Sequence, residues 1–382
     1  MKPLVSVLIP AYNHEQYVGA AIESVLNQTY ENFELLISDD CSTDGTRHVI
    51  SSCSDARIKT FFFNENGGTV NSLNVLLEAA KGDYIAVLGS DDIWMPEKLE
   101  KQLEVMANMP DIAACFTYSE IIDNVSNTVT DSSVFPLDIF NFNNCNREDM
   151  LCRLFLTGNH FCHSSVLIRT CAHREIGEYK IQYRQLHDFD LWVRILLRYP
   201  VYIIEEKLVK YRVFSTNDNV SNLTQENNIR LFREARYIFK NMFNEISDAD
   251  FVAGFKPCLV KSDAKTAEQI MCEKFFVLWN YSLWKYEYKL PALDYLMSHI
   301  DNLSFFECLT KEYNFSLNDI YKATGDYLSD CPKEFFQIDL NALESDCNTL
   351  RQELDNIHNS RMWKYYCILK KIKPLLRRKP NE

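Results

Sequence analysis

Two adjacent carboxylates, Asp91 and Asp92, directly follow a short apolar segment, residues 84–88, that has the composition of a buried strand. Adjacent carboxylates repel each other, and removing them from water costs free energy. A divalent cation offsets both effects, because Mg²⁺ and Mn²⁺ bind one or two protein carboxylates and fill their other positions with substrate phosphates and water. The pair therefore indicates a cation site. Taken alone, it is also typical of an ordinary acidic turn.

Two further polar clusters follow predicted strands, at residues 10–13 (PAYN) and 39–46 (DDCSTDGT). A carboxylate and an aromatic ring at neighbouring strand ends can recognise a flat base such as uracil, because the carboxylate accepts the ring N–H and the aromatic ring stacks on the base. Residues 39–46 alone are equally typical of a turn with a helix cap. Combined with a cation site, a base-binding site indicates a nucleoside diphosphate between the two.

Strand-like and helix-like segments alternate over the first 120 residues. This alternation predicts an α/β fold in which helices cover both faces of a mostly parallel sheet. Ligands bind at the carboxyl ends of the strands in such sheets, so the three polar clusters are expected at one edge. Strands are predicted at 5–9, 33–38, 58–62, 84–88 and 112–118, and helices at 14–28, 43–51, 70–80 and 97–108. The last helix is expected to start at Pro96, because proline suits the first helical turn.

Residues 120–160 are rich in Asn, Asp and Ser and are predicted to form a long loop over that edge. Further strands are predicted at 164–168, 201–204 and 208–214, and a helix at 188–197. Helical patterns such as 227–242 and 264–288 dominate after residue 216. We therefore predict an α/β domain at 1–215, a helical domain at 216–335 and a separate C-terminal segment at 336–382.

The segments VSVLIPAYNHEQYVGAAIESVLNQTYENFELLISDDCSTDGT and AKGDYIAVLGSDDIWMPEKL resemble family 2 glycosyltransferases of the GT-A fold, over roughly residues 1–215. The resemblance implies a Rossmann-like mixed sheet, a nucleotide-sugar donor and a cation, Mg²⁺ or Mn²⁺. It also implies that Asp92 is the metal ligand and that Asp91 contacts the sugar or ribose. The donor-binding residues that it implies are Pro10, Tyr12, Asn13, Asp40 and Asp91.

The segment LHDFDLWVRI, residues 186–195, resembles the one that supplies the catalytic base in this family. Asp188 is the matching aspartate. Asp190 is the alternative, although it is also placed to pair with Arg194 one helical turn later. The family usually has glutamate where this chain has His187.

The same resemblance implies an inverting reaction, in which ionised Asp188 takes the proton of an acceptor hydroxyl and that oxygen displaces the nucleotide from the sugar. UDP is the first expectation for the nucleotide, and dTDP would fit the same pocket. Phe214 stands where many relatives have histidine, which leaves any metal or phosphate role of that position open. His163 lies beside the expected acceptor site and is either functional or a hydrogen-bonded structural histidine.

The bulk composition excludes several classes of protein. The net charge of −13 argues against nucleic acid as a partner. The thirteen cysteines include no C-x-x-C pair, which favours reduced thiols over a disulfide framework or a zinc site. No apolar run approaches 18 residues, and Pro10 and Asn13 interrupt the N-terminal one, so we expect a first strand there and neither a signal peptide nor a membrane span.

The C-terminal segment has two distinct patterns. Apolar residues spaced by three and four over 340–357 predict a short coiled coil, and hence a possible homo-oligomer, or else a single docked helix. Residues 361–382 contain eight lysines and arginines against one acid, interleaved with an apolar stripe. This composition predicts an amphipathic tail on an anionic membrane surface, with an ordinary basic tail as the alternative.

Together these features predict a cytoplasmic enzyme, peripheral on the inner face of the cell membrane, that acts on a glycan or polyprenyl-linked acceptor in bacterial polysaccharide assembly such as O-antigen synthesis. The main alternative is a membrane-associated assembly protein with a degenerate transferase site. A receiver domain would need its acidic pair after the first strand, and a nucleotidyltransferase a glycine-rich basic loop there. Neither feature is present.

Overall fold

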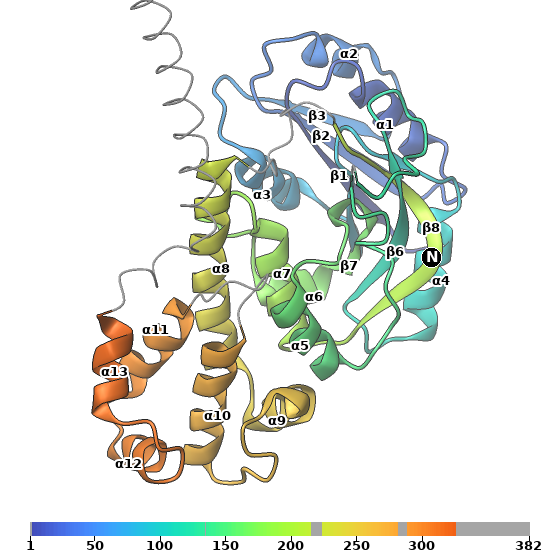
Figure 1. Cartoon of the computed structure of the whole chain (residues 1–382). Helices are drawn as coiled ribbons and strands as arrows, with labels where there is room; N and C mark the ends of the chain where they lie inside the picture. Colours follow the sequence, from blue (N-terminus) through green and yellow to red (C-terminus); the bar gives the residue numbers. More distant parts are fainter. Residues whose placement is uncertain (1, 134, 215–223, 282–288, 326–382) are drawn as a thin grey trace, which may run out of the picture. The chain divides into compact units, whose positions relative to one another are not determined.

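The protein is described by a computed structural model that covers residues 2–133, 135–214, 224–281 and 289–325 (Figure 1). These residues belong to one compact unit. The coiled coil predicted at 340–357 and the basic segment at 361–382 lie outside the described residues. The domain boundary predicted near residue 216 stays a prediction.

One eight-stranded sheet forms the centre of the described structure, with the strand order β3-β2-β1-β4-β7-β6-β8-β5. The strands are β1 (Val5–Ala11), β2 (Phe33–Asp39), β3 (Ile58–Phe62), β4 (Tyr84–Val87), β5 (Ile93–Trp94), β6 (Ala114–Ile122), β7 (Leu167–Arg169) and β8 (Val201–Arg212).

The sheet is mixed, as expected from the resemblance. β1 runs parallel to β2 and β4, β2 to β3, and β6 to β8. β7 is antiparallel to both of its neighbours, and β5 is antiparallel to β8. The two strands predicted at 201–204 and 208–214 are one strand, β8. Residues 205–207 are exposed, and the backbone continues through them with a register shift against β6 beside Tyr118.

Helices cover both faces of the sheet, and each face has its own apolar core. Along β1 the side chains alternate between these cores: Val7 and Ile9 join α1 and α4, whereas Leu8 joins α3 and α7. None of the described helices combines the length and apolar character needed to cross a bilayer. The α-helices of the sheet domain are α1 (Val18–Leu26), α2 (Thr46–Ser52), α3 (Thr69–Ala79), α4 (Lys98–Asn108), α5 (Arg147–Thr157), α6 (Thr170–Ile176) and α7 (His187–Leu196).

Several predicted boundaries are corrected by the structure. The first helix begins at Val18 and not at residue 14, because residues 12–16 form a loop that contacts the next strand end. Pro96 does not open a helix: β5 pairs with β8 before it, and α4 begins at Lys98. The predicted long loop at 120–160 contains α5, which Asn146 caps by accepting from the backbone N–H of Asp149.

A second set of helices follows the sheet and packs on α5 and α7 (Figure 1). The predicted helix at 227–242 is a longer helix, and that at 264–288 ends at Asn280 within the described residues. These helices are α8 (Gln225–Glu245), α9 (Asp248–Gly254), α10 (Ala267–Asn280), α11 (Leu290–His299), α12 (Leu303–Lys311) and α13 (Leu317–Thr324).

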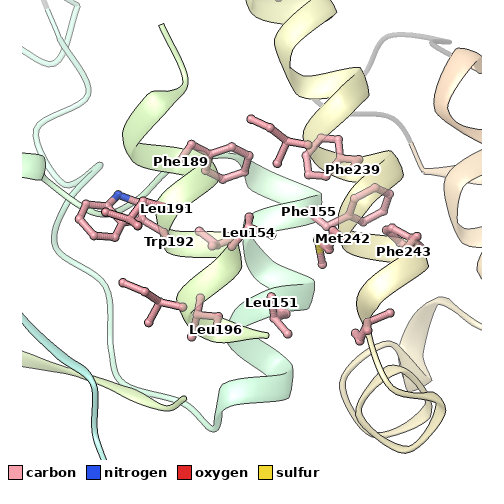
Figure 2. Close-up of a cluster of buried hydrophobic side chains, with 14 of the residues drawn as sticks. Leu151, Leu154, Phe155, Phe189, Leu191, Trp192, Leu196, Phe239, Met242 and Phe243 are labelled. Carbon is pink, nitrogen blue, oxygen red and sulfur yellow. The ribbon is translucent and has the colours of Figure 1, made fainter. Parts of the chain in front are cut away.

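Figure 2 shows the apolar cluster that joins α7 to α5 and α8. Phe239 of α8 lies with its ring centroid 5.1 Å from that of Phe155 on α5 and 5.9 Å from that of Phe189 on α7. All three side chains are buried. Because Phe189 directly follows Asp188, this cluster fixes the helix on which the predicted catalytic base is placed.

The Phe239→Ala substitution should lower the free energy of unfolding by about 3–5 kcal/mol, because it removes a buried ring at the meeting point of three helices. Denaturant unfolding followed by circular dichroism measures this change. Asn244→Ala, at an exposed position of the same helix, is the matched control. An equal effect of both substitutions would show that α8 is not held by this cluster.

Candidate functional site

The loops after β1 and β2 lie against each other at the carboxyl edge of the sheet. The Asn13 backbone N–H donates to Ser42 Oγ (2.9 Å), and Asn13 Oδ1 accepts from the Thr43 backbone N–H (2.8 Å). Asn13 adopts a φ of 52°, a conformation that asparagine tolerates better than most residues. The residue before it, Tyr12, is 44% exposed and therefore open to a ligand. Pro10 pairs with Ser38 near the ends of β1 and β2.

Asp40, the predicted base-reading carboxylate, is 3% exposed at the end of β2. Its two oxygens accept hydrogen bonds from the backbone N–H groups of Gly67 (2.8 Å) and Gly68 (2.7 Å). The positive φ of Gly68, 82°, lets the chain turn in this way. Asp40 therefore also fixes the loop between β3 and α3. Each carboxylate oxygen has the capacity to accept a second hydrogen bond.

His14 connects the first two clusters to the third. Its Nδ1 lies 2.7 Å from Ser90 Oγ, in the acidic turn after β4. Its ring stacks near that of Phe214, with centroids 6.3 Å apart, and meets the Tyr17 ring edge-on. Phe214, which replaces the histidine of many relatives, is thus part of an aromatic cluster at the edge of the predicted donor site.

The acidic turn brings the carboxylates of Asp91 and Asp92 to one place. A Cβ at Gly89 would lie 3.0 Å from Asp91 Oδ1 and 3.0 Å from Asp92 Oδ2, so both side chains converge over this glycine. Asp92 is 3% exposed. Burial raises the pKa of Asp92 well above its usual value, and the neighbouring charge of Asp91 raises this pKa further.

Protein groups compensate part of this cost. Asp92 Oδ1 accepts from the Arg212 backbone N–H (2.8 Å), and Oδ2 accepts from the Ser164 hydroxyl. The buried Arg212 guanidinium donates from Nε to the Asp91 backbone carbonyl (2.8 Å) and from Nη1 to the Asp123 carbonyl (2.7 Å). It also lies over the ring of Tyr17. Arg212 therefore fixes the backbone of the turn without pairing directly with either carboxylate.

The turn fits a divalent cation by the chemistry of its donors. Asp91 and Asp92 supply adjacent carboxylate oxygens, the ligands that Mg²⁺ and Mn²⁺ prefer, and a positive charge there would offset their repulsion. Among the described residues no group of three or more His, Cys, Asp or Glu side chains is arranged to hold a metal. A cation at this turn would therefore take its remaining ligands from substrate and water.

Asp188 lies in the first turn of α7, with its carboxylate held in a fixed orientation. Oδ2 accepts from Asn159 Nδ2 (2.8 Å), and Oδ1 accepts from the Phe189 backbone N–H (2.7 Å). Burial raises the pKa of Asp188. Asp190, the alternative base, is instead bound by Arg194 at 2.7 Å, which confirms the predicted helical ion pair.

The phenol of Tyr211 on β8 is influenced by the acidic residues of the site. Burial raises its pKa well above the usual value, and the charges of Asp92, Asp91 and Asp188 all add to this rise. The charges of the predicted base and of the acidic turn thus both raise the pKa of the Tyr211 phenol, although these residues lie nearly a hundred positions apart in sequence. The Tyr211 ring contacts Phe140, with centroids 5.0 Å apart, so the segment after β6 covers this edge as expected.

His163 is a hydrogen-bonded histidine. Its Nε2 lies 2.8 Å from the Tyr179 hydroxyl. Burial lowers the pKa of His163 well below its usual value, and the adjacent His187 lowers it further. His163 is therefore neutral at pH 7, which favours the structural interpretation. His187, in the place of the family's glutamate, lies beside Asp188 and opposes the rise in its pKa.

Glu234 of α8 fixes the loop that leads into α7. This buried carboxylate accepts hydrogen bonds from three successive backbone N–H groups, at 2.9 Å from Arg184, 3.0 Å from Gln185 and 2.8 Å from Leu186. These residues precede the first turn of α7, which contains Asp188. A residue of the second helical set therefore positions the helix of the predicted catalytic base.

Sequence reasoning missed most residues that orient the site. Ser164, Arg212 and Asn159 each hold a predicted site carboxylate or its turn from a distant part of the chain. No local spacing signals such contacts. Arg212 and Glu234 gave no signal either, because other charged residues surround each of them in its strand or helix.

Comparison with known proteins gives the family of the chain. The profile of glycosyl transferase family 2 matches residues 6–177. The Escherichia coli protein named UDP-Glc:alpha-D-GlcNAc-diphosphoundecaprenol beta-1,3-glucosyltransferase WfgD is 36% identical over 193 residues, which are 50% of this chain and 70% of WfgD. An uncharacterized glycosyltransferase of Rickettsia felis is 34% identical over 236 residues, 59% of this chain but only 37% of that protein.

Among solved structures, residues 1–349 of S. aureus TarS in complex with UDP-GlcNAc share the fold with a TM-score of 0.50. The sequence identity is 17%, and the match covers 87% of this chain and 82% of TarS. The chain belongs to the family 2 glycosyltransferases.

The Asp188→Asn substitution should increase stability more at neutral pH than in acid. Because the pKa of Asp188 is raised in the folded state, keeping this group ionised destabilises the fold as pH rises above the ordinary aspartate pKa of about 4. Below that pH the carboxyl is protonated in both states and the contribution disappears. Thermal unfolding from pH 3 to 8 measures the difference, with Asp111→Asn, an exposed aspartate, as control. If the gain in stability of Asp188→Asn over the wild type does not grow with pH, the result would contradict the burial of this charge.

The Glu234→Gln substitution should destabilise the protein by about 1–3 kcal/mol, because one acceptor oxygen becomes an N–H₂ group facing backbone donors. Chemical denaturation gives this value, and Glu245→Gln, exposed on the same helix, is the control. Amide hydrogen exchange at residues 184–186 should rise in the Glu234 variant alone. Unchanged exchange there would show that this carboxylate does not fix the loop.

Proposed function

We propose that this protein is an inverting glycosyltransferase that moves a sugar from a nucleotide diphosphate to a hydroxyl of a glycan or lipid-linked acceptor. The observation that carries the proposal is the acidic turn after β4, where the carboxylates of Asp91 and Asp92 converge over Gly89. Two carboxylates brought to one place, with Asp92 buried, cost free energy unless a cation and a substrate complete the site.

The donor is proposed to lie across the three loops at this edge. Tyr12 would stack on the base, and Asp40 would accept its ring N–H with the lone pairs that Gly67 and Gly68 leave free. Pro10 and Asn13 would line the same pocket, and Asp91 would contact the sugar or ribose. We favour UDP, the nucleotide in the name of the similar WfgD, and dTDP is the second choice.

Asp92 would hold Mg²⁺ or Mn²⁺, which when bound stabilises negative charge on the leaving phosphate. Asp188 would carry out the proton transfer. Its carboxylate, oriented by Asn159 and the Phe189 N–H, would take the proton of the acceptor hydroxyl, whose oxygen then forms the bond to the anomeric carbon as the bond to the phosphate breaks. One displacement inverts the anomeric centre. The raised pKa of Asp188 makes it a stronger base than an exposed aspartate.

The acceptor is proposed to be carried on a polyprenyl diphosphate in bacterial cell-surface polysaccharide synthesis, of which O-antigen synthesis is one case. The name of WfgD describes such an acceptor for that relative. The basic composition of residues 361–382 agrees with an enzyme held from the cytoplasm at the inner face of the membrane. An oligomer through 340–357 is part of the same proposal. The ordered contacts of Asp92 and Asp188 favour an enzyme over an assembly protein with a degenerate site.

Two aspartate variants test the proposed roles. Wild-type protein should bind UDP only with Mn²⁺ present, and Asp92→Asn should lose this binding, because the variant removes the carboxylate that would hold the cation. Asp188→Asn should keep it. Isothermal titration calorimetry with UDP, in Mn²⁺ or in EDTA, measures both.

Transfer from UDP-sugars to sugars linked to polyprenyl diphosphate should fall at least about a hundredfold in Asp188→Asn, the scale typical of general base catalysis. Asp190→Asn, which breaks a structural ion pair, should fold less stably but bind UDP. UDP binding that is the same without Mn²⁺ and in Asp92→Asn would contradict the assignment of the cation site. Normal transfer by Asp188→Asn would contradict the assignment of the base.

A further inference from the structure

A cavity of about 610 Å³ lies between the loop before α7 and the exposed side of α8. Its lining includes Tyr183 and Arg184 from the loop, and Arg230, Arg233 and Tyr237 from the helix. The residues so far assigned to the donor and to the base are not part of this lining. The loop that forms one wall leads directly into the helix of Asp188.

The side chains that line the cavity carry a net positive charge, with three arginines against two glutamates. Of its two acidic side chains, Glu234 is occupied by three backbone N–H groups, and Glu226 pairs with Arg230. Within the described part of the chain, Arg184 and Arg233 form no ion pair with a carboxylate. Two exposed guanidinium groups on opposite walls of one cavity are suited to a phosphate or diphosphate, which accepts their N–H groups in pairs.

An apolar surface adjoins these charges. Ile181, next to the lining residue Gln182, is 81% exposed, and Tyr237 in the lining is 54% exposed. Ile229 also lines the cavity. Large side chains exposed in this way beside a basic cavity match a ligand that carries an anionic group on a hydrocarbon chain.

We propose that this cavity binds the diphosphate of a prenyl-linked acceptor, with Arg184 and Arg233 on the phosphates and Ile181 beside the hydrocarbon. The proposal rests on the proposed function, and it adds the place where the acceptor is held. Since Arg184 lies four residues before Asp188, an acceptor anchored here would present its sugar from the side of the catalytic base. The donor phosphates would remain on the opposite side, at Asp91 and Asp92.

Binding of two probes in EDTA tests the proposal without any need for sugar transfer. Inorganic pyrophosphate and farnesyl diphosphate are titrated calorimetrically into the full-length protein. We expect farnesyl diphosphate to bind more tightly than pyrophosphate. The double variant Arg184→Ala/Arg233→Ala should weaken both about tenfold or more, because each guanidinium makes charge-assisted hydrogen bonds. Ile181→Ser should weaken only farnesyl diphosphate.

Arg198→Ala is the matched control, because it removes an exposed arginine that lies outside the cavity and pairs with Glu175. It should leave both affinities unchanged. The site would be overturned if neither probe binds, if the double variant does not weaken their binding, or if Arg198→Ala loses as much affinity as the double variant. Equal affinities for the two probes would overturn its assignment to a lipid-linked diphosphate in favour of a free anion. These results are independent of UDP binding, so failure here and failure of the proposed donor site can be told apart.

Discussion

The repulsion between Asp91 and Asp92 is the constraint on which the site depends. The turn after β4 places both carboxylates over Gly89, with Asp92 almost fully buried. Two contacts hold Asp92 in place, the Ser164 hydroxyl and the backbone N–H of Arg212. Neither contact is an ion pair, and the charge of the Arg212 guanidinium only partly offsets the burial that raises the pKa of Asp92. The arrangement is therefore incomplete in electrostatic terms, and a cation bound with an anionic substrate would complete it.

The second half of the site is held from the helical side of the molecule. Phe239 packs between α5 and α7, and Glu234, little more than one turn earlier on α8, binds the loop that opens α7. Asp188 is thereby oriented by residues that lie on both sides of it in sequence. The helices after the sheet thus do more than extend the fold, since they hold the loop that precedes the predicted base and form one wall of a basic cavity with that loop.

The periodicity of the sequence predicted the α/β fold and the edge at which the acidic and polar loops meet, because burial on two faces imposes a regular pattern on each strand, whereas the mixed sheet was implied by the family resemblance. It did not predict α5, whose polar surroundings resemble a loop, or the continuity of β8 through its exposed charges. The family resemblance supplied the candidate carboxylates. The groups that orient them, Arg212 and Glu234 above all, act across more than forty residues, and no local pattern encodes such distances.

The most direct measurement is a crystal structure of the protein with UDP and Mn²⁺, with the cation located by its anomalous scattering. We predict a single strong anomalous peak beside the Asp92 carboxylate, bridged to the UDP phosphates, with the uracil between Tyr12 and Asp40. The Asp188 carboxylate should face the same space from the other side. Mn²⁺ bound away from Asp92, or UDP bound outside the carboxyl edge of the sheet, would contradict the proposed site.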